Sequence, residues 1–240
     1  MLKTRGIVLR TTKYGETSVI ADIFTEEKGL RTFIAGNVRA AKTRMPFGLF
    51  QPMRIVELVS YYRESAQGVH RLKEMRPAQV FTGIPFDIKR GAIALFMAEV
   101  CRKCIQNEDE QREIFDFLCH TLSHIDSTPH PLANIHLYFL VHFSELLGFF
   151  PIPDEDSTGC FLDLREGIYT PSVPSHSHYL FPVQTARLTH IWQAPLELCH
   201  ENRIELPDRK NLSENLLDLY RLHIPGFGEI HTMQVLESVF

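Results

Sequence analysis

The stretch GIVLRTTKYGETSVIADIFTEEKGLRTFIAG, residues Gly6 to Gly36, decides the fold of the first part of the chain. GIVLRT and TSVIADIFT are short runs rich in β-branched residues, EEKG is a turn signal, and LRTFIAG alternates in polarity. Runs of this length and period are typical of β-strands joined by tight turns. Phe33, in the last run, is predicted to lie in a core.

Two further strand-like runs, MRIVELVSYY and VHRLKEM, follow after Pro52. Five strands within about 75 residues predict a small barrel, either of the five-stranded OB type or SH3-like. A longer connection separates the third run from the fourth. Its segment IAGNVRAAKTRM carries Arg39, Lys42 and Arg44 and no carboxylate, and it is predicted to be a loop that can include one helical turn.

Beyond this barrel the hydrophobic period becomes helical. A helix is predicted over residues 88–107 with Asp87 as its N-cap, and two amphipathic helices follow it. Proline and glycine interrupt the pattern at about 149–182, where CFLDLREGIYT predicts a hairpin turning at Glu166 and Gly167. We therefore expect an α+β protein with a barrel domain over 1–78 and an all-helical domain over 79–240 that carries this hairpin insertion.

Composition describes an ordinary globular chain. Its 240 residues are 44% hydrophobic, which is enough for a buried core. No apolar run approaches the roughly 20 residues that span a bilayer, and the first residues are too polar for a signal peptide. Five cysteines form no disulfide framework and suit a reducing compartment. The expected location is the cytoplasm.

Charge is divided unevenly along the chain. Residues 1–76 hold 14 basic and 7 acidic residues, a net charge of +7, whereas the remainder holds 11 and 22, a net charge of −11. A basic block on an acidic protein is typical of polyanion binding. The alternative is that the two oppositely charged parts attract each other within the fold.

Motifs for metal binding and catalysis are weak. Cys101 and Cys104 have zinc-ligand spacing but stand alone within a helical segment, and His120 with His124 lacks a third ligand. The sequence contains no nucleophile elbow, phosphate-binding loop or dinucleotide fingerprint. We expect no metal, no cofactor and no catalysis.

The basic set favours nucleic-acid binding instead, because a barrel with cationic loops can follow the phosphates of a single strand. Arg39, Lys42 and Arg44 are the predicted DNA-binding residues, with Arg10, Lys13 and Lys28 as further candidates.

The N-terminal run resembles the RecO family of bacterial recombination mediators. The matching positions are Gly6 to Leu9, Tyr14 to Glu16, Phe24 with Thr25, Gly29, Ala35 with Gly36, the basic loop that carries Arg39, Lys42 and Arg44, and Leu49 to Pro52. ELLGFFP, at Glu145 to Pro151, and the later LYRLHIPGF are also similar to family signatures.

The resemblance implies an OB-fold domain followed by a helical domain, and a DNA repair function without catalysis. It implies binding to single- and double-stranded DNA, strand annealing and, with RecR, loading of RecA onto DNA coated by single-stranded-DNA-binding protein, whose C-terminal tail the helical domain would accept. Such a protein would work in the cytoplasm at the nucleoid, with no membrane partner.

Many relatives carry a four-cysteine zinc site after the Leu-Gly-Phe segment, where this chain has Cys160 alone. The resemblance, with this departure, implies a hairpin without structural zinc. An RNA-binding barrel and a non-catalytic protein-adaptor bundle remain as alternatives, because both fit the same charge pattern.

Overall fold

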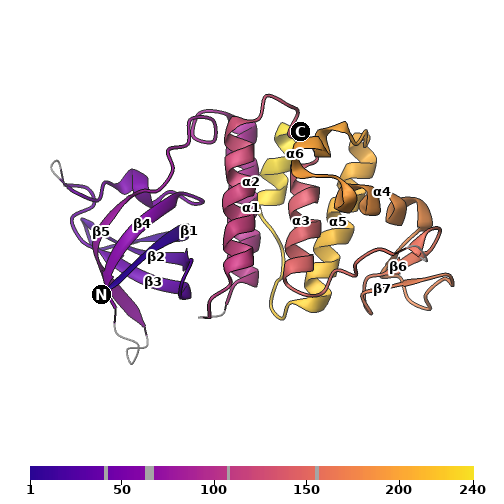
Figure 1. Ribbon diagram of the computed structural model, residues 1–240, viewed down its shortest axis with the longest axis horizontal. Coiled ribbons are helices and arrows are strands. Elements are labelled where there is room, and N and C mark those ends of the chain that lie inside the picture. The colour runs from indigo at the N-terminus through magenta and orange to yellow at the C-terminus, as the bar shows by residue number, and fades with distance from the viewer. Residues whose placement is uncertain (41–42, 63–67, 107–108, 155–156) are drawn as a thin grey trace. The chain divides into compact units, whose positions relative to one another are not determined.

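Five strands close into a barrel at the N-terminal end of the chain (Figure 1). They are β1 (Leu2–Tyr14), β2 (Ser18–Thr25), β3 (Gly29–Ala35), β4 (Ile55–Tyr61) and β5 (Val69–Pro77). Their order is β1-β2-β3-β5-β4, with β4 pairing back onto β1. β3 and β5 run parallel and the other neighbours antiparallel. The predicted five-stranded OB barrel is confirmed.

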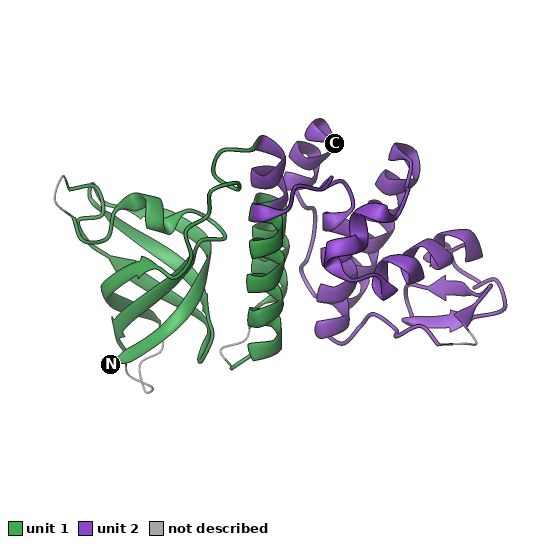
Figure 2. Cartoon of the chain, turned by 45° about the horizontal axis from the view of Figure 1, so that its top comes forward, with its two compact units in different colours: residues 1–87, 94–126 green, residues 88–93, 127–240 purple. Residues whose placement is uncertain are grey.

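This computed structural model describes residues 1–40, 43–62, 68–106, 109–154 and 157–240. They divide into two compact units, Met1–Asp87 with Ala94–Asp126 and Ile88–Ile93 with Ser127–Phe240 (Figure 2). Whether residues 1–78 and 79–240 fold as separate domains stays a prediction. No helix in the described part of the chain is long and apolar enough to cross a membrane.

The barrel core follows from the alternation of its strands. In β2 and β3 every second side chain points inward, and Val19, Ala21, Ile23 and Phe33 are fully buried there. Phe33 is a core residue, as the sequence predicts.

The first unit continues with two helices, α1 (Ile88–Cys104), whose first residues belong to the second unit, and α2 (Arg112–Ser127). The helical spacing of Ile114, Phe117 and Leu118 in the sequence predicts an apolar stripe on α2, and Ile114 and Leu118 are buried there but Phe117 is half-buried. Phe115 takes that place, and its ring lies 5.9 Å from the ring of Phe24 in β2. The stripe is therefore rotated by a fraction of a turn toward the barrel.

The connection from β5 to α1 is held by one carboxylate. Asp126 accepts hydrogen bonds from the backbone N–H groups of Thr82, Gly83 and Ile84, at 2.9, 2.7 and 2.8 Å. Three backbone donors are thereby satisfied at the end of α2, and the connection is fixed to the same unit as the barrel.

The second unit is built around α3 (Ile135–Leu146) (Figure 1). The elements that follow it are α4 (Pro182–Gln193), the short helix η3 (Leu196–Glu201), α5 (Leu206–His223) and α6 (Thr232–Val239). Tyr220 of α5 is buried beside Phe143 and donates a hydrogen bond to the Leu140 carbonyl at 2.8 Å. The sequence NLSENLLDLYRLHI places Leu212, Leu216 and Leu219 on one helix face with Tyr220, and all of them are buried, so this predicted apolar face is confirmed.

The predicted hairpin is also present. β6 (Phe161–Asp163) and β7 (Ile168–Thr170) pair across the turn at Glu166 and Gly167, and β8 (Tyr179–Leu180) adds a short third strand. Within the turn, Asp163 Oδ1 accepts the N–H groups of Arg165 and Glu166. Among the described residues no three His, Cys, Asp or Glu side chains gather as metal ligands. The predicted lack of structural zinc stays a prediction.

Candidate nucleic-acid interface

The basic loop begins where β3 ends, and its first residues are anchored on the barrel. Asn37 adopts a left-handed backbone with φ of 58°. The next residue, Val38, is buried; its N–H donates to the Thr17 carbonyl at 2.8 Å, and its carbonyl accepts from the N–H of Phe47 at 3.1 Å. The loop is therefore tied to the turn between β1 and β2, one of the turns through which OB folds bind oligonucleotides.

Met45 anchors the other end of this loop. Its side chain packs against the apolar core of the barrel, and the neighbouring Arg44 is exposed. Arg39 is also exposed, with its guanidinium carbon 5.1 Å from the centre of the Phe47 ring. A planar guanidinium over an aromatic face gains a cation–π attraction while it keeps its donors available. Both arginines thus project from anchored backbone.

Lys42, the third predicted loop cation, lies outside the described residues. The other three candidates are separated by the strand register. Lys13 of β1 pairs with Val19 of β2, which pairs with Ala35 at the end of β3. Lys13 therefore lies at the end of the β1-β2-β3 sheet where the basic loop starts. Arg10 is exposed in the middle of β1, opposite Asp22.

Lys28 lies in the turn between β2 and β3, at the opposite end of these three strands. Six residues of strand separate the two ends, a distance of about 20 Å. The register therefore places Lys13 near the start of the loop that carries Arg39 and Arg44, and it places Lys28 at the other end of β2.

Two neighbouring grooves extend from the loop along the outside of β5. One, of about 500 Å³, has Arg44 in its lining, and the other, of about 580 Å³, has Met45. The cations that line them form what we call the basic face: Lys3, Arg44, Arg71, Lys73 and Arg76.

Four cations of the basic face were absent from the predicted site. Arg71, Lys73 and Arg76 come from β5, whose sequence VHRLKEMRP places them on its exposed side, and Lys3 comes from β1. The alternation of exposed cations in β5 was the available signal. It could not show which loop the strand would meet, because the pairing of β5 with β3 joins positions more than 35 residues apart, such as Thr32 and Val69.

Charge on the basic face is only partly neutralised. Arg76 pairs with Glu57, and Lys73 Nζ lies 3.9 Å from a carboxylate oxygen of Glu74. Within the part of the chain that the structure describes, neither Arg44 nor Arg71 forms an ion pair with a carboxylate. Exposed pairs such as Lys73 with Glu74 are weak, so a phosphate can compete for the lysine.

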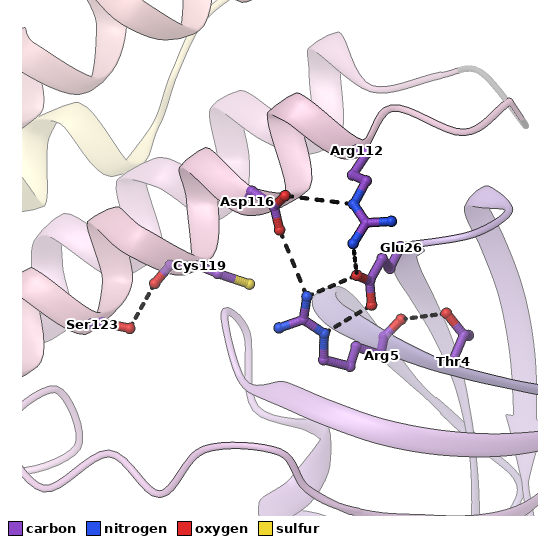
Figure 3. A network of polar contacts seen from close by, with 7 residues as sticks. All are labelled: Thr4, Arg5, Glu26, Arg112, Asp116, Cys119 and Ser123. Atoms are coloured by element: carbon purple, nitrogen blue, oxygen red, sulfur yellow. Dashed lines mark hydrogen bonds and ion pairs between the residues drawn. The ribbon is translucent and has the colours of Figure 1, made fainter.

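Arg5, in contrast, has a structural role (Figure 3). Its guanidinium donates two hydrogen bonds of 2.8 Å to Glu26 and lies 3.6 Å from a carboxylate oxygen of Asp116 in α2. Arg112 approaches the same Glu26 carboxylate at 3.6 Å. The hydrogen bonds from Arg5 lower the pKa of Glu26. One cation of the basic segment 1–76, Arg5, thus holds the barrel against α2.

The cysteine pair lies within α1. Cys101 is buried and Cys104 is half-buried, and burial raises the pKa of both thiols. A thiolate is the form that binds metal, so this environment disfavours a metal ligand.

Comparison with known proteins assigns the chain to the same family that its N-terminal run resembles. Two family models match, "Recombination protein O N terminal" over residues 1–81 and "Recombination protein O C terminal" over residues 85–228. The chain is 34% identical over 239 residues to a DNA repair protein RecO of Bacteroides fragilis, covering 99% of this chain and 98% of the relative. It is 32% identical over 238 residues to that of Phocaeicola vulgatus, with the same coverage. The chain therefore belongs to the RecO family of DNA repair and recombination proteins.

Proposed function

We propose that this chain is a non-catalytic recombination mediator that binds single- and double-stranded DNA through its barrel and promotes the annealing of strands. The observation that carries the proposal is that Arg44 of the anchored loop lines the same groove of an OB barrel as Lys3 of β1 and Arg76 of β5. Cations that neutralise phosphates release condensed counterions, which gives affinity without sequence preference. Family membership makes DNA the polyanion to test first.

The test is a salt titration with fluorescent oligonucleotides. Replacing Arg39 and Arg44 with Ala is expected to weaken binding similarly for unrelated sequences. It should reduce the slope of log K against log salt by about 0.7 per lost contact on single strands. The double variant Arg165→Ala with Arg203→Ala removes the same charge from exposed positions of the second unit and serves as the control.

An unchanged affinity and slope in the Arg39 and Arg44 variant would contradict the proposal. Tighter binding of RNA than of DNA with the same sequence would favour the RNA-binding alternative. A wild-type chain that binds no DNA even at low salt would favour the protein adaptor. Lys42→Ala is tested as a separate variant, because the prediction that Lys42 binds DNA rests on the sequence alone.

The mediator role adds two protein partners, RecR and the C-terminal tail of single-stranded-DNA-binding protein. Together with RecR, the chain is expected to speed the assembly of RecA on DNA coated by that protein, in the cytoplasm at the nucleoid. Omitting RecR, or using coating protein without its tail, should abolish the acceleration. Equal RecA assembly with and without this chain would contradict the mediator role.

A further inference from the structure

Tyr61 presents an aromatic ring to solvent at the end of β4. Even-numbered residues of β4 such as Leu58 and Ser60 point into the barrel, so Tyr61 points outward, and this residue is 55% exposed. The next residue differs, because the ring of Tyr62 packs on the ring of His70 with 4.7 Å between centres. Among the described residues no other ring packs on Tyr61.

The groove beside Tyr61 is cationic and has the size of a small-ligand site. Its lining residues are Gly36, Asn37, Met45, Tyr61, Arg71, Leu72 and Lys73. Two are cations and none is a carboxylate. Its volume of about 580 Å³ lies within the range of about 300–1,000 Å³ that is usual for ligand pockets.

Strand register sets the distance between the ring and the cations. Tyr61 and Arg71 are directly paired across β4 and β5, which places their Cβ atoms about 5 Å apart. The register shifts between Val59 and Ser60, and the extra residue on β5 at this bulge is Lys73. Arg71 and Lys73 flank the buried Leu72 and therefore lie on the same outer side of β5, so one aromatic face has two cations within a nucleotide's reach.

An aromatic face with adjacent cations suits a nucleotide whose base is free. Base stacking on a side chain requires an exposed π-face, which an unpaired nucleotide offers and a base inside a duplex does not. The cations suit the phosphate beside that base. We propose that this groove holds one unpaired nucleotide of single-stranded DNA, with its base against Tyr61 and its phosphate between Arg71 and Lys73. This inference rests on the proposed function, and it assigns to Tyr61 the preference for single strands.

The experiment compares the affinities for single-stranded and duplex DNA of the same length at one salt concentration. Tyr61→Ala is expected to weaken single-strand binding about fivefold or more and to leave duplex binding within twofold. Tyr61→Phe keeps the ring and should bind like wild type, whereas Tyr61→Leu keeps apolar bulk without the ring and should behave like Tyr61→Ala. Phe86→Ala removes an exposed aromatic from outside the barrel and should change neither affinity.

Salt dependence separates the two kinds of contact. The slope of log K against log salt should stay unchanged in Tyr61→Ala, since stacking releases no counterion, and should fall by about 0.7 for single strands in Arg71→Ala. Equal losses for single strands and duplex in Tyr61→Ala would overturn the base contact, and so would full activity of Tyr61→Leu. If the Arg39 and Arg44 variant loses affinity while every Tyr61 variant binds like wild type, this inference fails and the proposed function stands. If the wild-type chain binds no DNA, both fail.

Discussion

Gly6 is the position where one added methyl group would disturb the barrel most directly. Its Cα pairs with Thr25 on one side of β1 and with Val56 on the other, and a Cβ would lie 2.5 Å from Ile23 Cγ2. Gly6→Ala is expected to lower the free energy of unfolding by about 1–3 kcal/mol, because overpacking shifts Ile23 or the strand. Urea titration measures the loss.

Gly48→Ala is the matched control, since no atom lies within 4 Å of a Cβ at that position. It should change stability by less than about 0.5 kcal/mol. Similar losses in both variants would show that the barrel does not need glycine at residue 6 in particular.

His136 makes the second unit sensitive to acid. It is buried in α3, its Nε2 lies 2.9 Å from the Ser213 hydroxyl oxygen, and burial, with the nearby charge of Arg209, lowers its pKa to about 3. The unfolded chain binds a proton near pH 6.5 and the folded chain does not, so this stability is complete above pH 6.5 and is lost as pH falls. We expect a loss of about 2–3 kcal/mol between pH 6.5 and 4.5.

Trp192, the single tryptophan, reports this loss because it lies in α4 of the same unit and donates to Glu145 of α3 at 2.7 Å. His136→Gln should flatten the dependence of stability on pH, and His120→Gln, an exposed position in α2, should not. Parallel pH curves for wild type and His136→Gln would contradict the assignment.

At the scale of elements, the contact between the barrel and α2 depends on Glu26 (Figure 3). Glu26→Gln is expected to cost about 1–2 kcal/mol, because two charge-assisted hydrogen bonds from Arg5 are weakened. Hydrogen exchange of residues 112–126, followed by mass spectrometry, should become faster.

Asp116→Asn is the matched variant on the helix side. Its side chain is 56% exposed and its carboxylate lies 3.6 Å from the Arg5 guanidinium, so a smaller effect is expected. Unchanged exchange in Glu26→Gln would show that the apolar contact of Phe24 with Phe115 is sufficient.

Sequence alone predicts those elements that carry a long, regular pattern. The alternation of β3 and the apolar face of α5 both appear in the structure where the sequence puts them. β8 has two residues and η1 (Phe47–Phe50) has four, which is too short for any period to show. β1 is longer than its apolar run, because a barrel strand tolerates residues such as Lys3 and Lys13 on its outer side.

The candidate site is predictable where it is local. Arg39 and Arg44 appear as a run of cations in one loop. Tyr61, Arg71 and Lys73 join that loop through the parallel pairing of β3 with β5, a contact between distant positions that no local pattern encodes. The role of Arg5 was hidden for the same reason, since its partners Glu26 and Asp116 lie 21 and 111 residues away.

At the scale of the whole molecule, two compact units predict unfolding that is not two-state. Trp192 reports the second unit, whereas far-ultraviolet circular dichroism reports both. At pH 5 the urea midpoint from fluorescence should lie below the midpoint from dichroism, because acid weakens the unit that contains His136. The gap should narrow at pH 7.5. Coincident curves at both pH values would mean that the units unfold together.

Barrel closure also determines how other molecules can be recognised here. β1 pairs with both β2 and β4, and β5 pairs with both β3 and β4, so most backbone donors and acceptors of the barrel are already used within it. A binding partner therefore finds little unpaired strand edge on the barrel to which it could add a strand of its own. The barrel must hold such a partner through its side chains. Contacts made by main chain escape detection by alanine scanning, whereas those made by side chains do not. Systematic alanine substitution of the outward-facing residues of the barrel should therefore give a nearly complete map of the side chains that contact a bound partner.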